Sequence, residues 1–196
     1  MTQLGKLAAA AGTAAALGGG YLGLVTGAVP LDLGLGRRIR PLGPFGIDIA
    51  APPEIVFDVL SEPYLGRQTR AVADKIRVLE RGSDMVLAAH RTPLRGRLVA
   101  TTVETVRFTR PDRVDFLLTR EPVSHVREQF LLRVQGSGTR LGYTGELGTD
   151  LWALGARWGT AVAGPWQRTV RTTFTAVKAE AERRQAARAK HAPPSR

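Results

Sequence analysis

Residues 110–133 read RPDRVDFLLTREPVSHVREQFLLR, and this stretch decides the fold class. From residue 123 apolar and polar side chains alternate, which is the pattern of a strand buried on one side. One face of this strand would carry four apolar side chains: Val126, Phe130, Leu132 and Val134. The turn residues Glu121-Pro122 separate it from another apolar run, and so short a connection predicts an antiparallel hairpin.

Outward from this hairpin, the same pattern extends over residues 75–147. Gly, Pro, Asp and Ser interrupt this pattern at short intervals and mark turns between strands. Six strands are predicted, over 75–81, 84–92, 97–108, 112–119, 123–134 and 139–147. A seventh, Phe45–Ile49, precedes a short helix that begins at Pro52-Pro53-Glu54, because proline and an acidic residue suit a first helical turn.

Residues 150–189 predict a long amphipathic helix. Apolar side chains recur every three or four residues, at Trp158, Val162, Trp166, Val170, Phe174 and Val177. Gly164-Pro165 should kink or restart the helix, because an interior proline removes a hydrogen bond. We expect residues 189–196 to be a disordered tail.

The N-terminus is apolar. Residues 7–31 carry no charge and are long enough to cross a bilayer, so residues 1–31 are predicted to be a membrane-spanning segment and residues 32–44 a linker. Cleavage as a signal peptide near Ala28 is the alternative. The arginines that follow favour a single-pass membrane protein with its soluble domain in the cytoplasm.

Small residues fall at four-residue steps along this segment, at Ala11, Ala15, Gly19, Gly23 and Gly27. On a helix they form a smooth face that another helix can approach, which would allow a homodimer through the membrane. A stretch rich in alanine and glycine also produces such a ladder by chance.

The composition excludes several kinds of site. The chain of 196 residues has no cysteine, and its three histidines lack the spacing of a helical metal pair, so neither a metal site nor a cofactor is predicted. The net charge of +11 would attract a polyanion. No nucleic-acid-binding motif accompanies the arginines, which favours a lipid surface over nucleic acid.

The stretch IDIAAPPEIVFDVLSEPYLGR (residues 47–67), together with residues 110–133, resembles the START-like (SRPBCC) superfamily, of the polyketide cyclase/dehydrase and lipid-transport type. The resemblance covers residues 45–188. It implies an α+β helix-grip fold, in which a seven-stranded antiparallel sheet wraps around the long C-terminal helix and leaves a ligand-binding cavity between them.

If the resemblance holds, apolar side chains from the sheet and the helix line that cavity. The predicted ligand-binding residues are Phe116, Leu118, Val126, Glu128, Phe130, Leu132, Tyr143, Trp158, Val162 and Trp166. The alternative is that they pack against one another as an ordinary core.

Glu128 is the acidic residue on the apolar face of the 123–134 strand. A buried carboxylate is costly unless it is paired, so Glu128 needs an arginine, a tyrosine or a ligand. It would suit general acid–base chemistry in a cyclase. It would equally suit a structural pair with an arginine or an indole N–H, and no catalytic residue is assigned.

Three functions follow from this pattern. The first is membrane-tethered binding or transport of a hydrophobic small molecule, such as a lipid, a quinone or a polyketide-like compound. The second is a cyclase or dehydratase that uses the same cavity, and the third is an interaction protein without a ligand. An enzyme should place two or more titratable groups facing one another in the interior.

Overall fold

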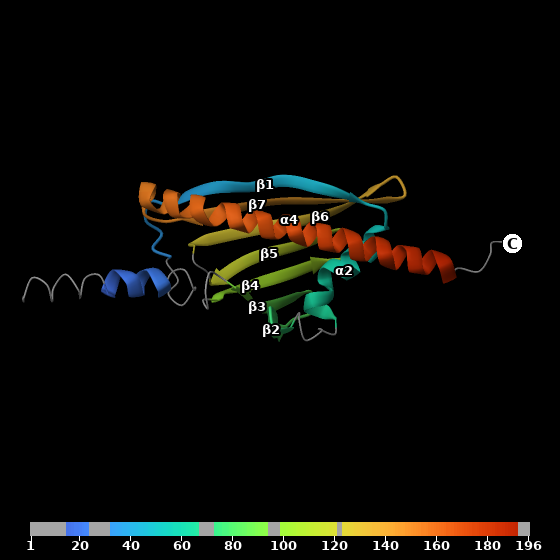
Figure 1. The fold of residues 1–196 in the computed structure, drawn as a ribbon, viewed down its shortest axis with the longest axis horizontal. Helices are drawn as coiled ribbons and strands as arrows, with labels where there is room; N and C mark the ends of the chain where they lie inside the picture. The colour runs from blue at the N-terminus through green and yellow to red at the C-terminus, as the bar shows by residue number, and fades with distance from the viewer. Residues whose placement is uncertain (1–14, 24–31, 67–72, 94–98, 121–122, 192–196) are drawn as a thin grey trace, which may run out of the picture.

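The computed structural model describes residues 15–23, 32–66, 73–93, 99–120 and 123–191. Seven antiparallel strands form one sheet, and a helix of 40 residues lies across it (Figure 1). The elements are β1 (Arg38–Ile49), α2 (Pro53–Leu65), β2 (Ile76–Arg81), β3 (Met85–Pro93), β4 (Val99–Thr109), β5 (Arg113–Arg120), β6 (His125–Gln135), β7 (Gly138–Thr149) and α4 (Trp152–His191). The predicted α+β fold, with its seven-stranded sheet and long C-terminal helix, is confirmed.

The strand order is β1-β7-β6-β5-β4-β3-β2. Strands β2 to β7 follow one another as neighbours, and β1 returns to pair with β7 from Arg38↔Thr149 to Ile49↔Thr139. The predicted strands lie within about two residues of the observed ones from β2 to β7 because their alternation is set by one buried face.

That buried face forms the core with α2 and α4. Val114, Val126 and Leu141 are fully buried on the sheet, and Phe174 and Ala181 pack from α4. Val134, predicted on the same face, is instead 73% exposed. It lies one residue before the end of β6, beside the turn at Gly136, and so outside the packed core.

The predicted linker over residues 32–44 is wrong in its second half, because β1 already begins at Arg38. Residues 33–37 are also held in place, since Asp150 accepts hydrogen bonds from the N–H groups of Leu33 (2.6 Å) and Gly34 (2.8 Å) and from Nε of Arg37 (2.8 Å). The glycines and prolines that indicated a linker serve a positive-φ turn and an irregularity in β1 instead.

Helix α4 runs through Pro165 without restarting. Ala163 and Val170 are buried on either side of the proline, so packing against the sheet holds both parts of the helix. The helix also continues to His191, which corrects the predicted tail at residues 189–191. Residues 192–196 lie outside the described part of the chain.

Residues 15–23 are helical, and the rest of the predicted membrane-spanning segment lies outside the described residues. Among the helices that the structure describes, none is both long and apolar enough to cross a bilayer. The spanning segment therefore stays a prediction.

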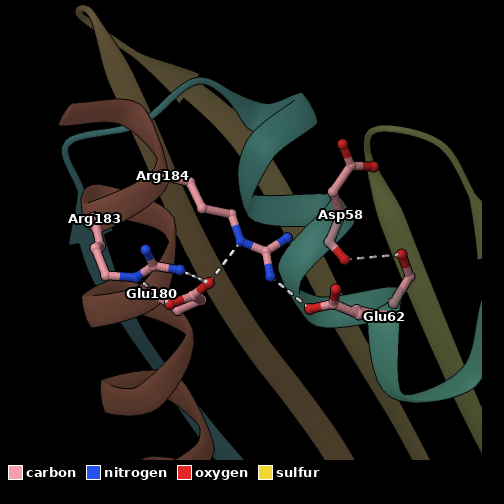
Figure 2. Close-up of polar contacts among 6 residues, drawn as sticks. Asp58, Glu62, Glu180, Arg183 and Arg184 are labelled. Atoms are coloured by element: carbon pink, nitrogen blue, oxygen red, sulfur yellow. Dashed lines mark hydrogen bonds and ion pairs between the residues drawn. The ribbon is translucent and has the colours of Figure 1, made fainter. Parts of the chain in front are cut away.

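Ion pairs fasten α2 to α4 at the end of the fold where α4 finishes. Figure 2 shows the guanidinium of Arg184 between Glu180 of its own helix and Glu62 of α2, at 2.6 Å from each. Asp58 of α2 makes a further ion pair with Arg110, at the turn between β4 and β5. The helix-grip arrangement is thus tied at one end by Arg184 and at the other by Asp150.

The junction at Asp150 predicts a strict need for glycine at position 155. A Cβ atom built on Gly155 would lie 1.6 Å from the backbone oxygen of Asp150, so Gly155→Ala must displace the start of α4. We expect a loss of about 1–3 kcal/mol or more in the free energy of unfolding, measured by urea denaturation.

Gly164→Ala is the matched control in the same helix. The nearest atom to its Cβ would be a guanidinium nitrogen of Arg168 at 3.6 Å, an ordinary contact. We expect little change in stability, because the gain in helix propensity is opposed by the clash of an alanine with the following proline. Equal losses in both variants would contradict the proposed crowding at Asp150.

Candidate functional site

Glu128 lies in the interior, where α4 crosses the sheet. It stands opposite Phe116 of β5 and Gly145 of β7 and is 5% exposed. The Tyr143 hydroxyl donates a hydrogen bond to its Oε1, and the indole Nε1 of Trp166 donates another to the same oxygen at 2.7 Å. The carboxylate thus joins two strands of the sheet to the helix.

A glycine at position 145 makes this geometry feasible. A Cβ atom there would lie 3.1 Å from the Tyr143 hydroxyl and 3.2 Å from Cγ of Glu128. These contacts, and one of 3.0 Å to the backbone oxygen of Arg127, are tighter than ordinary van der Waals contact, so a side chain at this position would require its neighbours to shift by a few tenths of an ångström. The sequence predicted that Glu128 needs a partner, and a tyrosine together with an indole N–H fulfils that need.

Burial raises the pKa of Glu128 to about 7, although the hydrogen bonds from Tyr143 and Trp166 act in the opposite direction. Burial also raises the pKa of Tyr143, and the nearby Glu128 adds to this effect. Tyr143 therefore stays a neutral hydrogen-bond donor, whereas Glu128 is poised to gain or lose a proton near neutral pH.

A second polar cluster occupies the same face, formed by Tyr64 of α2, His90 of β3 and Glu104 of β4. Nε2 of His90 lies 2.7 Å from Oε1 of Glu104 and 3.3 Å from the Tyr64 hydroxyl. The rings of Tyr64 and His90 stack with their centres 5.7 Å apart. Burial and the nearby charges of Glu104 and Glu128 raise the pKa of Tyr64.

Sequence reasoning missed this second cluster, although Glu104 carried the same signal as Glu128. It shares the inward face of β4 with Thr102 and Val106, as an acidic residue within a buried alternation. In the sequence His90 stands far from the other histidines, and Tyr64 falls in residues 61–70, a stretch typical of an irregular turn or a second short helix. Tyr64 is in fact near the end of α2, which turns it over the sheet.

Aromatic rings connect the two clusters. The ring of Phe116 lies 5.9 Å from that of Tyr64 and 5.1 Å from that of Phe130, and Phe130 lies 5.3 Å from Tyr143. The groups also interact electrostatically, because Glu104 raises the pKa of Glu128 and His90 lowers it. Several titratable groups therefore share one aromatic interior, which is suited to holding a polar atom of an apolar molecule or to moving a proton.

The other predicted site residues belong to the same core. Leu118, Val126 and Leu132 are buried on the sheet, while Val162 and Trp158 are half-buried on α4 and pack against it. The structure thus brings all ten predicted residues to one interior. Among the residues it describes, no three potential metal ligands gather.

No family model matches the sequence, and no curated protein matches it either. Solved structures match in shape: the ZhuI aromatase/cyclase from Streptomyces sp. R1128 has a TM-score of 0.59 at 19% identity, over 75% of this chain and 96% of that one. Norcoclaurine synthase from Thalictrum flavum, a point mutant in complex with a transition-state analogue, gives 0.55 at 10% identity, over 76% and 96%.

A protein from Thermus thermophilus gives a TM-score of 0.54 at 17% identity, over 74% of this chain and 94% of that one. At these identities the likeness concerns the fold. The helix-grip architecture implied by the START-like resemblance is confirmed, and no residue role is transferred from these proteins.

The raised pKa of Glu128 predicts a specific dependence of stability on pH. A carboxyl whose pKa is higher in the folded state stabilises the fold fully below its unfolded value of 4.5, and this contribution is lost as the pH rises through about 7. The loss between these limits is about 3 kcal/mol. Urea denaturation of the wild type and of Glu128→Gln across this range measures it.

We expect Glu128→Gln to remove most of this pH dependence, because the amide keeps an acceptor for Tyr143 but does not titrate. Asp150 serves as the contrast, since its hydrogen bonds to Arg37 and to backbone N–H groups lower its pKa to about 2. Asp150→Asn should change the pH dependence only below the unfolded value of that carboxyl, near 4. An unchanged profile in Glu128→Gln would show that another group titrates in the neutral range.

Proposed function

We propose that this protein binds a hydrophobic small molecule between the sheet and α4, with an oxygen atom of that molecule at Glu128. One observation carries this proposal: a buried, titratable carboxyl stands among aromatic side chains in the interior of a helix-grip fold. Burying a carboxyl is costly even when one of its oxygens accepts two hydrogen bonds, and an apolar residue would fill a purely structural core at lower cost. A hydrogen bond to a polar atom of a ligand would explain why a carboxyl occupies this buried position.

The surroundings favour an apolar and partly aromatic ligand. Phe45, Phe130 and Phe174 place their rings 4.6–6.5 Å from the ring of Tyr143. A polyketide-like molecule or a quinone combines flat apolar rings with oxygen atoms, and this matches both the rings and the carboxyl. The name of the ZhuI aromatase/cyclase supports the same ligand class.

Cyclase-type catalysis is the second candidate, and the paired clusters favour it over the interaction-protein hypothesis. An enzyme of this type needs interior groups that can donate and accept protons. Glu128 with its pKa of about 7 would exchange a proton with the substrate, and the cluster of His90 and Glu104 would provide a second titratable site on the same face. The likeness to aromatase/cyclases supports this candidate as well.

Ligand binding is tested on the full chain purified in mild detergent. Native mass spectrometry should reveal a co-purified small molecule, and a hydroxylated anthraquinone should quench the fluorescence of Trp166 on titration. We expect Glu128→Gln to weaken binding of this probe about tenfold, because a hydrogen bond to a charged group contributes about 1.5 kcal/mol or more.

Glu146→Gln is the control, since this carboxylate contacts His125 at 2.9 Å and is 41% exposed. It should bind the probe like the wild type. A retained ligand without turnover in Glu128→Gln would favour the enzyme. Absence of both a co-purified molecule and a fluorescence response would contradict the binding function.

We also propose that the uncharged run at residues 7–31 remains attached as a membrane tether, with the domain on the cytoplasmic side. N-terminal sequencing of the protein from the membrane fraction should find residues 1–28 still present. A mature chain that begins near residue 29 would contradict the tether and favour a signal peptide.

A further inference from the structure

Exposed apolar side chains gather around the first turn of α4 and the segment that leads into β1. We call this group the end surface; its members are Leu33, Leu35, Trp152 and Leu154, each between 51% and 69% exposed. Soluble surfaces rarely gather large apolar residues in this way without a partner.

The end surface is held firmly. The N–H of Leu151 donates to the backbone oxygen of Leu35 at 2.8 Å, and the N–H of Trp152 donates to that of Gly36 at 3.0 Å. A Cβ atom on Gly36 would lie 2.3 Å from the Trp152 ring, so the ring lies directly against the glycine. The side chain of Asp150 holds the same segment by accepting hydrogen bonds from the N–H groups of Leu33 and Gly34. The outward direction of these side chains is therefore part of the fold.

Backbone strain accompanies this exposure. Leu151 and Trp152 adopt φ values of 70° and 48°, which residues other than glycine rarely adopt. This conformation is strained for residues with a side chain, and the surrounding hydrogen bonds hold both residues in it. The chain thus accepts strain at the position that presents a tryptophan to the outside.

Nearby charged residues and the N-terminal segment of the same chain indicate what covers the end surface. Arg38 and Arg157 are exposed beside it, and the uncharged run over residues 7–31 ends two residues before Leu33. The helix at residues 15–23 reaches the same end of the fold, where the ring of Tyr21 lies 6.4 Å from that of Trp158 (Figure 1).

We propose that the end surface docks on an anionic lipid bilayer, with Trp152 and Leu154 in the interfacial region and Arg38 and Arg157 on the lipid headgroups. Aromatic and aliphatic side chains with exposed arginines nearby match the interface of a membrane that carries negative charge. A second copy of this chain would bring the same arginines against each other, which opposes self-association. The proposal does not depend on the ligand, and its test separates docking from the tether.

The absence of cysteine makes a site-specific test feasible. Leu154→Cys and Val134→Cys would each carry a nitroxide spin label on the full chain, reconstituted into vesicles of phosphatidylcholine and phosphatidylglycerol. Val134 is the matched control, because it is 73% exposed but lies next to the β6–β7 turn, at the opposite end of β6 from the first turn of α4. Flotation of the vesicles reports attachment, and power saturation reports the depth of each label.

We expect the label at position 154 to become accessible to oxygen and protected from a water-soluble nickel complex. The label at position 134 should stay exposed to the nickel complex. Two changes should reduce the protection of the label at position 154 from the nickel complex several-fold: vesicles of phosphatidylcholine alone, or the combined substitutions Arg38→Glu and Arg157→Glu. In both cases the tether should still keep the protein on the vesicles. Unfolding curves of the labelled variants confirm that the fold is intact.

Three results would overturn the proposal. If the protein floats with the vesicles but the label at position 154 remains fully accessible to the nickel complex, the tether is supported and docking of the end surface is excluded. Protein that does not float would exclude both. Protection without vesicles, together with dipolar broadening that disappears on dilution with unlabelled protein, would show that a second copy covers the end surface.

Discussion

The contact between Glu128 and its two donors is the constraint on which the arrangement of sheet and helix depends. A carboxyl this deeply buried must be neutral or well hydrogen-bonded, since the penalty for an unpaired buried ion is several kcal/mol. Tyr143 comes from the neighbouring strand and Trp166 from α4, so satisfying one oxygen fixes how the helix lies over the sheet. Gly145 leaves the space that Tyr143 and Glu128 occupy, so the lack of a side chain at this position is part of the same constraint.

Asp150 shows that burial alone does not raise the pKa of a carboxyl. Its side chain is fully buried, yet two backbone N–H groups and Arg37 bind its charged form and lower its pKa to about 2. Glu128 receives two hydrogen bonds from neutral donors and forms no ion pair within the described part of the chain, so desolvation prevails. The first carboxylate is charged at neutral pH and suits a structural joint, while the second titrates near neutral pH and would suit acid–base chemistry or ligand binding.

The strands could be predicted from the sequence because a sheet with one buried face imposes a period of two on every strand. The same logic identified Glu128, whose acidic side chain interrupts an apolar face. It failed at residues 38–44, where glycine and proline are typical of linkers and only the pairing with β7 reveals a strand. The predicted alternative of a helix restart at Pro165 also failed, because the tertiary packing that carries α4 through the proline cannot be read from local propensity. The cluster of Tyr64, His90 and Glu104 was out of reach for a related reason: its members lie on α2, β3 and β4, and nothing local pairs Glu104 with a particular histidine.

Helix α4 unites the interior site with the end surface. Trp152 lies at its first residue and Trp166 fourteen positions further, which corresponds to about 21 Å along the helix axis. If the end surface rests on a bilayer, the proposed ligand site at Glu128 lies beside Trp166, about 21 Å along the helix from the residue proposed to touch the lipid. A domain oriented in this way would exchange an apolar ligand with the membrane over a short path and shield it from water meanwhile. If both proposals hold, the hydrogen bonds of Asp150 would keep the start of α4 fixed to the segment that leads into β1, and so would keep the docked surface in a constant position relative to the interior site.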